Sequence, residues 1–324
     1  MATSTVKTSV LILSDTHGEE FDVPPQYADV AIHCGDLTEE SKIAEFRTTL
    51  DLLRRLDAPL KLVVAGNHDF TLDTPTFMER LSEAPEHLDD DLVKREFGDF
   101  GEARKLIDDA KDAGIVFLDE GNYQFTLANG SRLRVYATPV TPGKGGWGFK
   151  YDPESGHDFV ISEGTDIVIS HGPPLGVLDY TDSRTRAGCP HLFGAVARTR
   201  PRLHCFGHIH EGWGAKLVTW RDRLNDAPSH FTDVDNNRST VIDKLANMIP
   251  NKFDTEESAA EKKAKARSHV QRGCATTSHC SGDAEPLRPG EQTLFVNASS
   301  QGNHPQLPHQ PFWMVNIELP TSID

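Results

Sequence analysis

The stretch VLILSDTHG, from Val10 to Gly18, begins with four apolar residues and ends in a cluster of polar residues and glycine. Apolar runs of this length, bounded by turn residues, are typical of strands that are buried on both faces of a sheet. The same pattern recurs four times, at residues 30–36, 62–69, 167–174 and 203–210. Open α/β sheets place their chemistry just past the carboxyl ends of the strands, so we expect these five polar clusters to share one crevice.

The rest of the chain extends this pattern to an α/β fold. We predict strands at Val6–Leu13, Asp29–His33, Lys61–Ala65, Ile115–Leu118, Tyr123–Leu127, Arg132–Ala137, Ile167–Ser170, Leu203–Phe206, Thr293–Val296 and Phe312–Glu318. Apolar residues at helical spacing predict a helix at Glu39–Leu56, and a charged amphipathic segment predicts another at Asp91–Ala113. We therefore expect a single domain over residues 1–324, with two mixed β-sheets packed face to face and flanked by helices.

Residues 221–291 differ from the rest of the chain because they show almost no apolar periodicity. Their charged run at residues 256–267 is rich in alanine and has good helix propensity. We interpret this segment as a surface insertion within the domain, flexible or carrying a loose solvated helix. An alternative is a small zinc site built from Cys274, His279 and Cys280, although three ligands without matched pairs are poor zinc-site spacing.

Charge and composition limit the function classes. A formal charge of −16 over 324 residues repels a polyanion, which argues against binding to extended nucleic acid. The five cysteines show no framework spacing, and no stretch approaches the ~20 apolar residues of a membrane span. The apolar run near the N-terminus is too short for a signal peptide. We expect a cytoplasmic protein with no membrane partner; the sequence does not indicate an oligomeric state.

The spacing of the polar residues suits metal binding. Asp15 and His17 are two residues apart, as are His208 and His210, and such residues project to the same side of an extended backbone. The carboxylate of Asp36 has two oxygens and can bridge two cations. Two divalent ions held by two carboxylates, neutral ligands and a hydroxide would leave a small positive charge that attracts phosphate. Mixed imidazole and carboxylate ligands suit Mn²⁺, Fe or Zn²⁺ better than Mg²⁺.

Five motifs, in order, resemble those of the calcineurin-like (class III) metallophosphoesterase superfamily: Asp15-Thr16-His17, Gly35-Asp36, Gly66-Asn67-His68-Asp69, His171 and Gly207-His208-Ile209-His210. Any one motif is weak evidence, but all five in order, each after an apolar run, are specific. The resemblance spans residues 8 to about 215 and returns at Thr293–Glu318. The spacing is most similar to a narrower group, the small metallophosphoesterase-domain-containing phosphodiesterases related to the brain 239 protein.

The resemblance implies a role for each matching residue. Asp36 would bridge two metal ions, and each ion would have three further ligands: Asp15, His17 and His210 for one, and Asn67, His171 and His208 for the other. His68 would contact phosphate and protonate the leaving oxygen, and Asp69 could orient the His68 imidazole.

These residues lead us to expect a metal-dependent phosphodiesterase that hydrolyses small nucleotide-like phosphodiesters through a hydroxide activated by two metal ions. A phosphomonoesterase or nucleotidase could use the same site, and a non-catalytic metal-binding scaffold is a third interpretation. The Gly-rich loop Thr141–Asp152 could stack Trp147 or Phe149 on a base at the rim of the site, or be an ordinary surface loop. Arg184 and Arg186 could reach a phosphate or be solvated.

Overall fold

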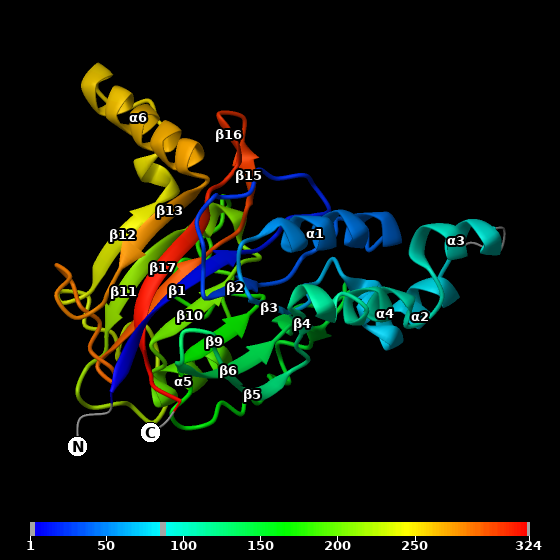
Figure 1. The fold of residues 1–324 in the computed structure, drawn as a ribbon, viewed down its shortest axis with the longest axis horizontal. Coiled ribbons are helices and arrows are strands. Elements are labelled where there is room, and N and C mark those ends of the chain that lie inside the picture. Colours follow the sequence, from blue (N-terminus) through cyan, green and yellow to red (C-terminus); the bar gives the residue numbers. More distant parts are fainter. Residues whose placement is uncertain (1–3, 85–88, 323–324) are drawn as a thin grey trace.

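The apolar runs form the central strands of two mixed β-sheets in the computed structural model, which describes residues 4–84 and 89–322 (Figure 1). The first sheet has the order β13 (Cys274–Ser278), β17 (Phe312–Pro320), β1 (Thr5–Leu13), β2 (Val30–His33), β3 (Leu60–Val63) and β4 (Ile115–Phe117). The second has the order β12 (Thr240–Lys244), β11 (Gly214–Thr219), β14 (Gln292–Asn297), β10 (Leu203–Phe206), β9 (Ile167–Ser170), β6 (Arg132–Thr138) and β5 (Gly121–Thr126).

The strands that carry the predicted site are parallel to their neighbours. Strands β1, β2 and β3 run parallel in the first sheet, and β9 and β10 run parallel in the second. Antiparallel pairs, such as β1 with β17 and β5 with β6, complete the mixed sheets. Two short pairs stand apart from the sheets: β7 (Thr141–Pro142) with β8 (Lys150–Tyr151), and β15 (Gln301–His304) with β16 (Leu307–His309).

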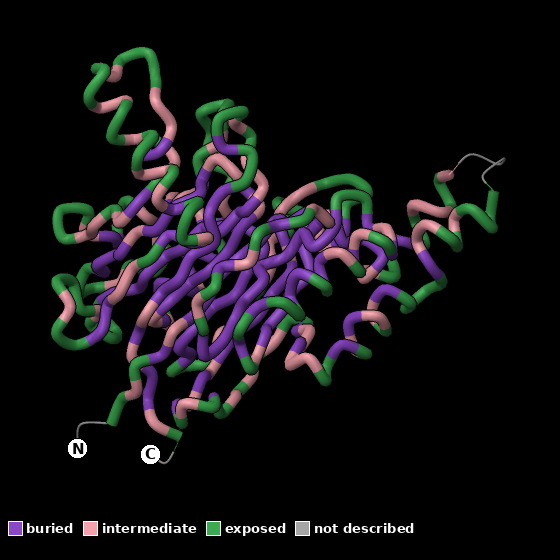
Figure 2. Tube along the Cα trace, turned by 45° about the horizontal axis from the view of Figure 1, so that its top comes forward, coloured by how far each residue is buried: buried purple, intermediate pink, exposed green. Residues whose placement is uncertain are grey.

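Alternation along each central strand supplies two layers of core, because successive side chains point to opposite faces. In β1, Val10 and Ile12 pack between the two sheets, whereas Leu11 and Leu13 pack under the helices that cover the first sheet. All four of these side chains are buried, and Figure 2 shows the buried trace concentrated in the strands. The predicted α/β architecture of two face-to-face sheets flanked by helices is therefore confirmed.

Helices cover the outer faces. Helix α1 (Ile43–Arg55) buries Phe46 and Leu50 against the first sheet, and α5 (Pro190–Thr199) buries Phe193 against the second. Helix α1 begins four residues later than predicted from Glu39. The remaining helical elements are η1 (Phe70–Leu72), α2 (Thr74–Ser82), α3 (Asp90–Phe97), α4 (Glu102–Asp108), η2 (Lys111–Ala113), η3 (His210–Gly212), η4 (Leu245–Asn247) and α6 (Glu256–Arg272).

The prediction of one continuous helix at Asp91–Ala113 is wrong. The chain instead forms α3 and α4, separated by a turn in which Gly98 and Gly101 have φ angles of 76° and 80°. These left-handed conformations cost a glycine little and end the run of helical hydrogen bonds. The apolar spacing continued through the break, which is why periodicity alone did not reveal it.

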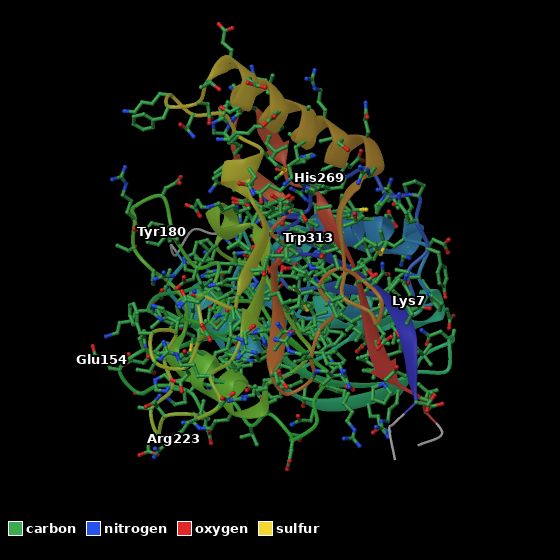
Figure 3. The ribbon with its side chains drawn as sticks, turned by 90° about the vertical axis from the view of Figure 1, so that its left-hand side faces the viewer. Lys7, Glu154, Tyr180, Arg223, His269 and Trp313 are labelled. Carbon is green, nitrogen blue, oxygen red and sulfur yellow. The ribbon has the colours of Figure 1, made fainter. Side chains whose placement is uncertain are left out.

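Residues 221–291 add an element to the edge of each sheet. Strand β12 pairs with β11 in the second sheet, and β13 pairs with β17 in the first. Between them α6 stands out from the body of the protein with a largely exposed trace (Figures 1 and 2). His269, labelled in Figure 3, is the buried residue of this helix and lies 3.3 Å from the carboxylate of Asp243 in β12.

The zinc alternative for this segment gains no support. Among the described residues, Cys274, His279 and Cys280 do not form a group whose ligand atoms converge. The His279 ring is instead hydrogen-bonded on both sides, to the Thr277 hydroxyl at 2.8 Å and the Glu285 carbonyl at 2.7 Å. Within residues 4–84 and 89–322, no helix is both long enough and apolar enough to cross a bilayer.

Candidate metal centre

The tips of the two sheets meet where the polar clusters end. Ser14, just past β1, forms a parallel bridge with Ser299, just past β14, so the first sheet touches the second at this point. Turns after β2, β3, β9 and β10 open at the same place. Ligand atoms of Asp15, His17 and His210 lie within 4.8 Å of one another, and so do those of Asp36, His171 and His208. The structure thus brings together side chains that are up to 195 residues apart in sequence.

Backbone conformation aims these side chains. Asp15, His17, Asp36 and His208 have φ angles of 52°, 47°, 53° and 68°, in the left-handed region that residues other than glycine rarely adopt. Such conformations cost on the order of 1–3 kcal/mol each and persist only where the surroundings enforce them. They lie in three turns, after β1, β2 and β10, and each of these turns carries candidate ligands, so the strained backbone conformation coincides with the site.

Two glycines allow the turns to approach the ligands closely. A Cβ atom on Gly66 would lie 2.2 Å from Asp36 Oδ1, and one on Gly207 would lie 2.0 Å from Asp15 Oδ2. Both separations are far shorter than any van der Waals contact. Glycine at 66 and 207 is therefore a requirement of the packed carboxylates.

In the first group, Asp15 is the central anion. Its Oδ1 lies 3.3 Å from His210 Nε2, and the backbone N–H of His208 donates to both of its oxygens. His17 Nε2 lies 3.4 Å from His210 Nε2. Burial would raise the pKa of Asp15, but the hydrogen bond and charge of His210 outweigh burial and hold that pKa well below its usual range. Burial lowers the pKa of His17.

In the second group, His171 lies among oxygen ligands. Its Nδ1–H donates to the Cys34 carbonyl at 3.0 Å, which fixes the ring so that Nε2 faces Asp36 Oδ2 at 3.2 Å and Asn67 Oδ1 at 3.0 Å. Burial opposes the charged form, yet the charge and hydrogen bond of Asp36 raise the pKa of His171 to about 9. Burial lowers the pKa of His208 to about 3, so its imidazole is neutral and free to act as a ligand.

Asp36 lies between the two groups. Its Oδ2 is 3.2 Å from His171 Nε2 on one side and 4.0 Å from His17 Nε2 on the other. It also belongs to a third convergent group, with His17 and His68. Burial would raise the pKa of Asp36, but the charge and hydrogen bond of His171 lower it. This is the position that a ligand shared between two cations must occupy.

The residues fit metal ions by their own electrostatics. Asp15 and Asp36 are fully buried anions, and buried charges require compensation. The same carboxylates raise the pKa values of His171 and His210, which shows how strongly this site favours positive charge. Metal binding displaces any proton on these rings, because imidazole coordinates in its neutral form. The nitrogen and oxygen donors suit Mn²⁺, Fe or Zn²⁺.

His68 lies at the edge of the centre. Its Nδ1–H donates to the carbonyl oxygen of Glu39 at 2.6 Å, which leaves Nε2 as the atom that can exchange a proton. Its ring stacks edge-on against His17, with centroids 4.8 Å apart, and packs on Trp147 at 4.4 Å. The Glu39 carboxylate also holds His17, with Oε2 2.7 Å from Nδ1. Glu39 was not among the residues singled out from the sequence, and it orients two of them.

The role expected for Asp69 needs correction. Its carboxylate does not orient the His68 ring, because Glu39 does so. The Asp69 oxygens instead accept hydrogen bonds from the backbone N–H groups of Gly66, Leu37 and Thr38 and from the Thr38 hydroxyl. Asp69 is therefore a buried tie between the turns that follow β2 and β3, and it holds Asp36 and Asn67 in register.

The loop around Trp147 reaches the edge of the centre, where Trp147 contacts His68; stacking on a base stays a prediction. Trp147 is 41% exposed and covers the His68 ring. From the same loop Lys150, which sequence patterns did not single out, interacts electrostatically with Asp36, and burial lowers its pKa. Arg186 pairs with the buried Asp179 at 2.6 Å, and Arg184 is exposed. Of the basic residues considered, Lys150 is thus the one whose charge acts on candidate ligands, Asp36 and His208.

Comparison with known proteins identifies the family. Residues 8–212 match the family described as calcineurin-like phosphoesterase. The chain is 36% identical over 215 residues to metallophosphoesterase domain-containing protein 1 of Homo sapiens and of Mus musculus, covering 64% of this chain and 62% of each relative. A UPF0046 protein of Caenorhabditis elegans is 32% identical over 221 residues, covering 65% of this chain and 53% of its own. The match thus spans less than two thirds of these relatives' length. The chain belongs to the calcineurin-like metallophosphoesterases.

Proposed function

We propose that this metallophosphoesterase is a metal-dependent phosphodiesterase that hydrolyses small, nucleotide-like phosphodiesters. The observation that carries the proposal is the convergence of all seven candidate ligands, with Asp36 between the two groups and His68 at the edge. In this arrangement Asp15, His17 and His210 would hold one cation, Asn67, His171 and His208 the other, and Asp36 both. Two bound divalent ions would lower the pKa of a water nucleophile and neutralise charge on the phosphate.

The protein's own groups account for the rest of the chemistry. With Nδ1 of His68 committed to the Glu39 carbonyl, a proton on Nε2 can pass to the departing alkoxide oxygen. The indole of Trp147 shields one face of that imidazole from water. His17 is held by the Glu39 carboxylate, so the positions of the acid and of one ligand are coupled.

A diester is favoured over a monoester by the modest positive charge around the centre. The ammonium of Lys150 is one cation that interacts electrostatically with Asp36, while Arg186 is engaged by Asp179. A dianionic monoester gains from several basic contacts, whereas a monoanionic diester does not need them. The net charge of −16 also favours a small substrate over an extended nucleic acid.

The test is hydrolysis of bis(p-nitrophenyl) phosphate by protein loaded with Mn²⁺. We expect His68→Ala to lower kcat by roughly 10²–10⁴-fold, the range for loss of a general acid. His191→Ala, which removes an exposed histidine outside the centre, is the matched control and should leave kcat unchanged. Faster turnover of p-nitrophenyl phosphate than of the diester would favour a phosphomonoesterase. Two bound ions without turnover of either ester would favour a non-catalytic scaffold.

A further inference from the structure

A cavity with a volume of about 430 Å³ lies next to His210 of the metal centre. One wall comes from the 221–291 segment, through η4 and the residues that follow it, and the other from the β15–β16 hairpin and η3. Its apolar lining is Leu245, Ile249, Pro250 and Leu307. In Figure 1 the hairpin rises at the upper edge of the molecule, the edge from which α6 also projects.

Contacts to His210 connect this cavity to the centre. Glu211, in the cavity wall, directly follows His210 in η3. Gln310, also in the wall, donates from Nε2 to the His210 carbonyl at 3.2 Å. Asn303 of β15 hydrogen-bonds the His210 ring. The wall of the cavity is therefore in direct contact with a candidate metal ligand.

An unsatisfied acceptor marks the wall. Gln310 is 4% exposed, and its Oε1 has no hydrogen-bond partner among the described residues. A buried acceptor without a donor costs on the order of 1–3 kcal/mol, so a rotation of the Gln310 amide that brings Oε1 to a ligand N–H or O–H group would be favourable. The Nε2 donor of the Gln310 side chain is already hydrogen-bonded to the backbone carbonyl of His210.

The charged residues of the lining favour a cationic ligand group over an anionic one. Asp182 and Glu211 contribute two carboxylates, and no lysine or arginine is among the described residues that line the cavity. An anionic group entering it meets like charge beside an apolar surface, whereas an ammonium or amino group meets carboxylates and the Gln310 acceptor.

We propose that this cavity is a substrate subsite that binds the organic group esterified to the phosphate and selects an amino-bearing group over an anionic one. The proposal rests on the phosphodiesterase function proposed above. It assigns the 221–291 segment a role in substrate selection, because that segment supplies the apolar wall through Leu245 and Ile249.

The experiment compares three p-nitrophenyl phosphodiesters with the same leaving group, in which the second ester is ethanolamine, ethanol or glycolate. We expect the Mn²⁺-loaded protein to hydrolyse the ethanolamine ester with roughly tenfold higher kcat/KM than the glycolate ester, as two nearby carboxylates would produce. Ile249→Lys, which places a cation in the wall, should abolish or reverse this ratio while the ethyl ester is still hydrolysed. Phe253→Lys, at a position 85% exposed in the same segment and outside the lining, is the matched control.

Failure of the subsite and failure of the phosphodiesterase function give different results. Hydrolysis of the ethyl ester with a ratio near one, or a ratio that Ile249→Lys leaves unchanged, overturns the subsite and leaves the phosphodiesterase function standing. If none of the esters is hydrolysed, the phosphodiesterase function fails, and calorimetric binding of phosphoethanolamine and phosphoglycolate decides the subsite. Tighter binding of phosphoethanolamine, lost in Ile249→Lys, would support it, and equal binding would overturn it.

Discussion

At the metal centre each candidate ligand follows directly after a buried strand, whereas residues 221–291 form edge strands and a helix that stands largely in solvent. The centre is held by strained turns, glycines with no room for a Cβ, and hydrogen bonds to buried carboxylates. The segment is held by the pairing of β12 to β11 and of β13 to β17, by hydrogen bonds around Asp233 and Asp243, and by Met248 in the core between the sheets. Strained backbone and buried charges thus fix the geometry of the first region, whereas ordinary edge pairing and packing fix that of the second.

This difference separates what each region can do. A side chain whose conformation is fixed by its backbone and its neighbours can bind a metal ion without reorganisation. An edge segment cannot supply such accuracy, but it can change its residues without disturbing the sheets, and so it suits substrate selection. Substitutions in the two regions should therefore have separable effects.

The substitution expected to have the largest effect is Asp36→Asn, in the metal centre. Replacing the carboxylate between the two groups removes several kcal/mol of charge stabilisation, so kcat/KM for a phosphodiester should fall by roughly 10³-fold or more. The number of bound ions, measured by elemental analysis of Mn²⁺-loaded protein, should fall with it. Near-normal circular dichroism would show that the sheets remain. Retention of two ions with activity within tenfold of the parent would refute the position assigned to Asp36.

A smaller effect is expected for Glu39→Gln, which weakens the 2.7 Å contact to His17 Nδ1 and keeps the carbonyl that holds His68. Loss of such a supporting contact typically costs about 10–100-fold in metal affinity or activity. Glu40→Gln is the matched control, because the Glu40 carboxylate is exposed and pairs with Lys42 outside the centre. Titration of both variants with Mn²⁺ measures the effect, and equal affinities would show that Glu39 does not support the ligand.

The sequence predicted the centre better than the segment for a physical reason. Runs such as Val10–Leu13 and Ile167–Ser170 are buried on both faces, so composition alone indicated strands, and polar residues after them had to meet at one edge. Glu39 and Lys150 gave no signal, because a lone charged residue in a loop looks the same whether it faces solvent or a ligand. The contact between Glu39 and His17 depends on how the turn after β2 folds, which no periodicity encodes.

The predictions of helix boundaries and edge strands failed for other reasons. The break between α3 and α4 rests on two glycines in left-handed conformations, within apolar spacing that continued past them. Strand β13 was missed because it is an edge strand in which only the first two side chains are buried, so the others need not be apolar. Helix α5 did carry a signal, a proline at its start followed by Leu192, Phe193 and Val196 at helical spacing, and weighing that segment as a helix would have found it.

The smallest effect expected to distinguish the two regions comes from Asp243, in the 221–291 segment, whose contribution to the free energy of unfolding depends on pH. Its carboxylate, 6% exposed, accepts hydrogen bonds from Lys265 Nζ at 2.8 Å and Asn247 Nδ2 at 3.0 Å, and lies 3.3 Å from His269 Nε2. Burial would raise its pKa, but the hydrogen bonds of His269 and Lys265 outweigh burial and lower it to about 2. Because the folded pKa is below the ordinary value, the unfolded chain binds a proton first as the pH falls.

The stabilisation is therefore complete above about pH 4 and is lost as the pH falls through 2. A shift of this size corresponds to about 2 kcal/mol, so Asp243→Asn should lower the free energy of unfolding by that amount at pH 6 and remove part of the decline between pH 4 and 2. Denaturant unfolding at a series of pH values measures it, with the exposed Asp222→Asn as control. Turnover of an unselective diester should stay within twofold of the parent. A large loss of turnover with little loss of stability would show that the segment and the metal centre are coupled.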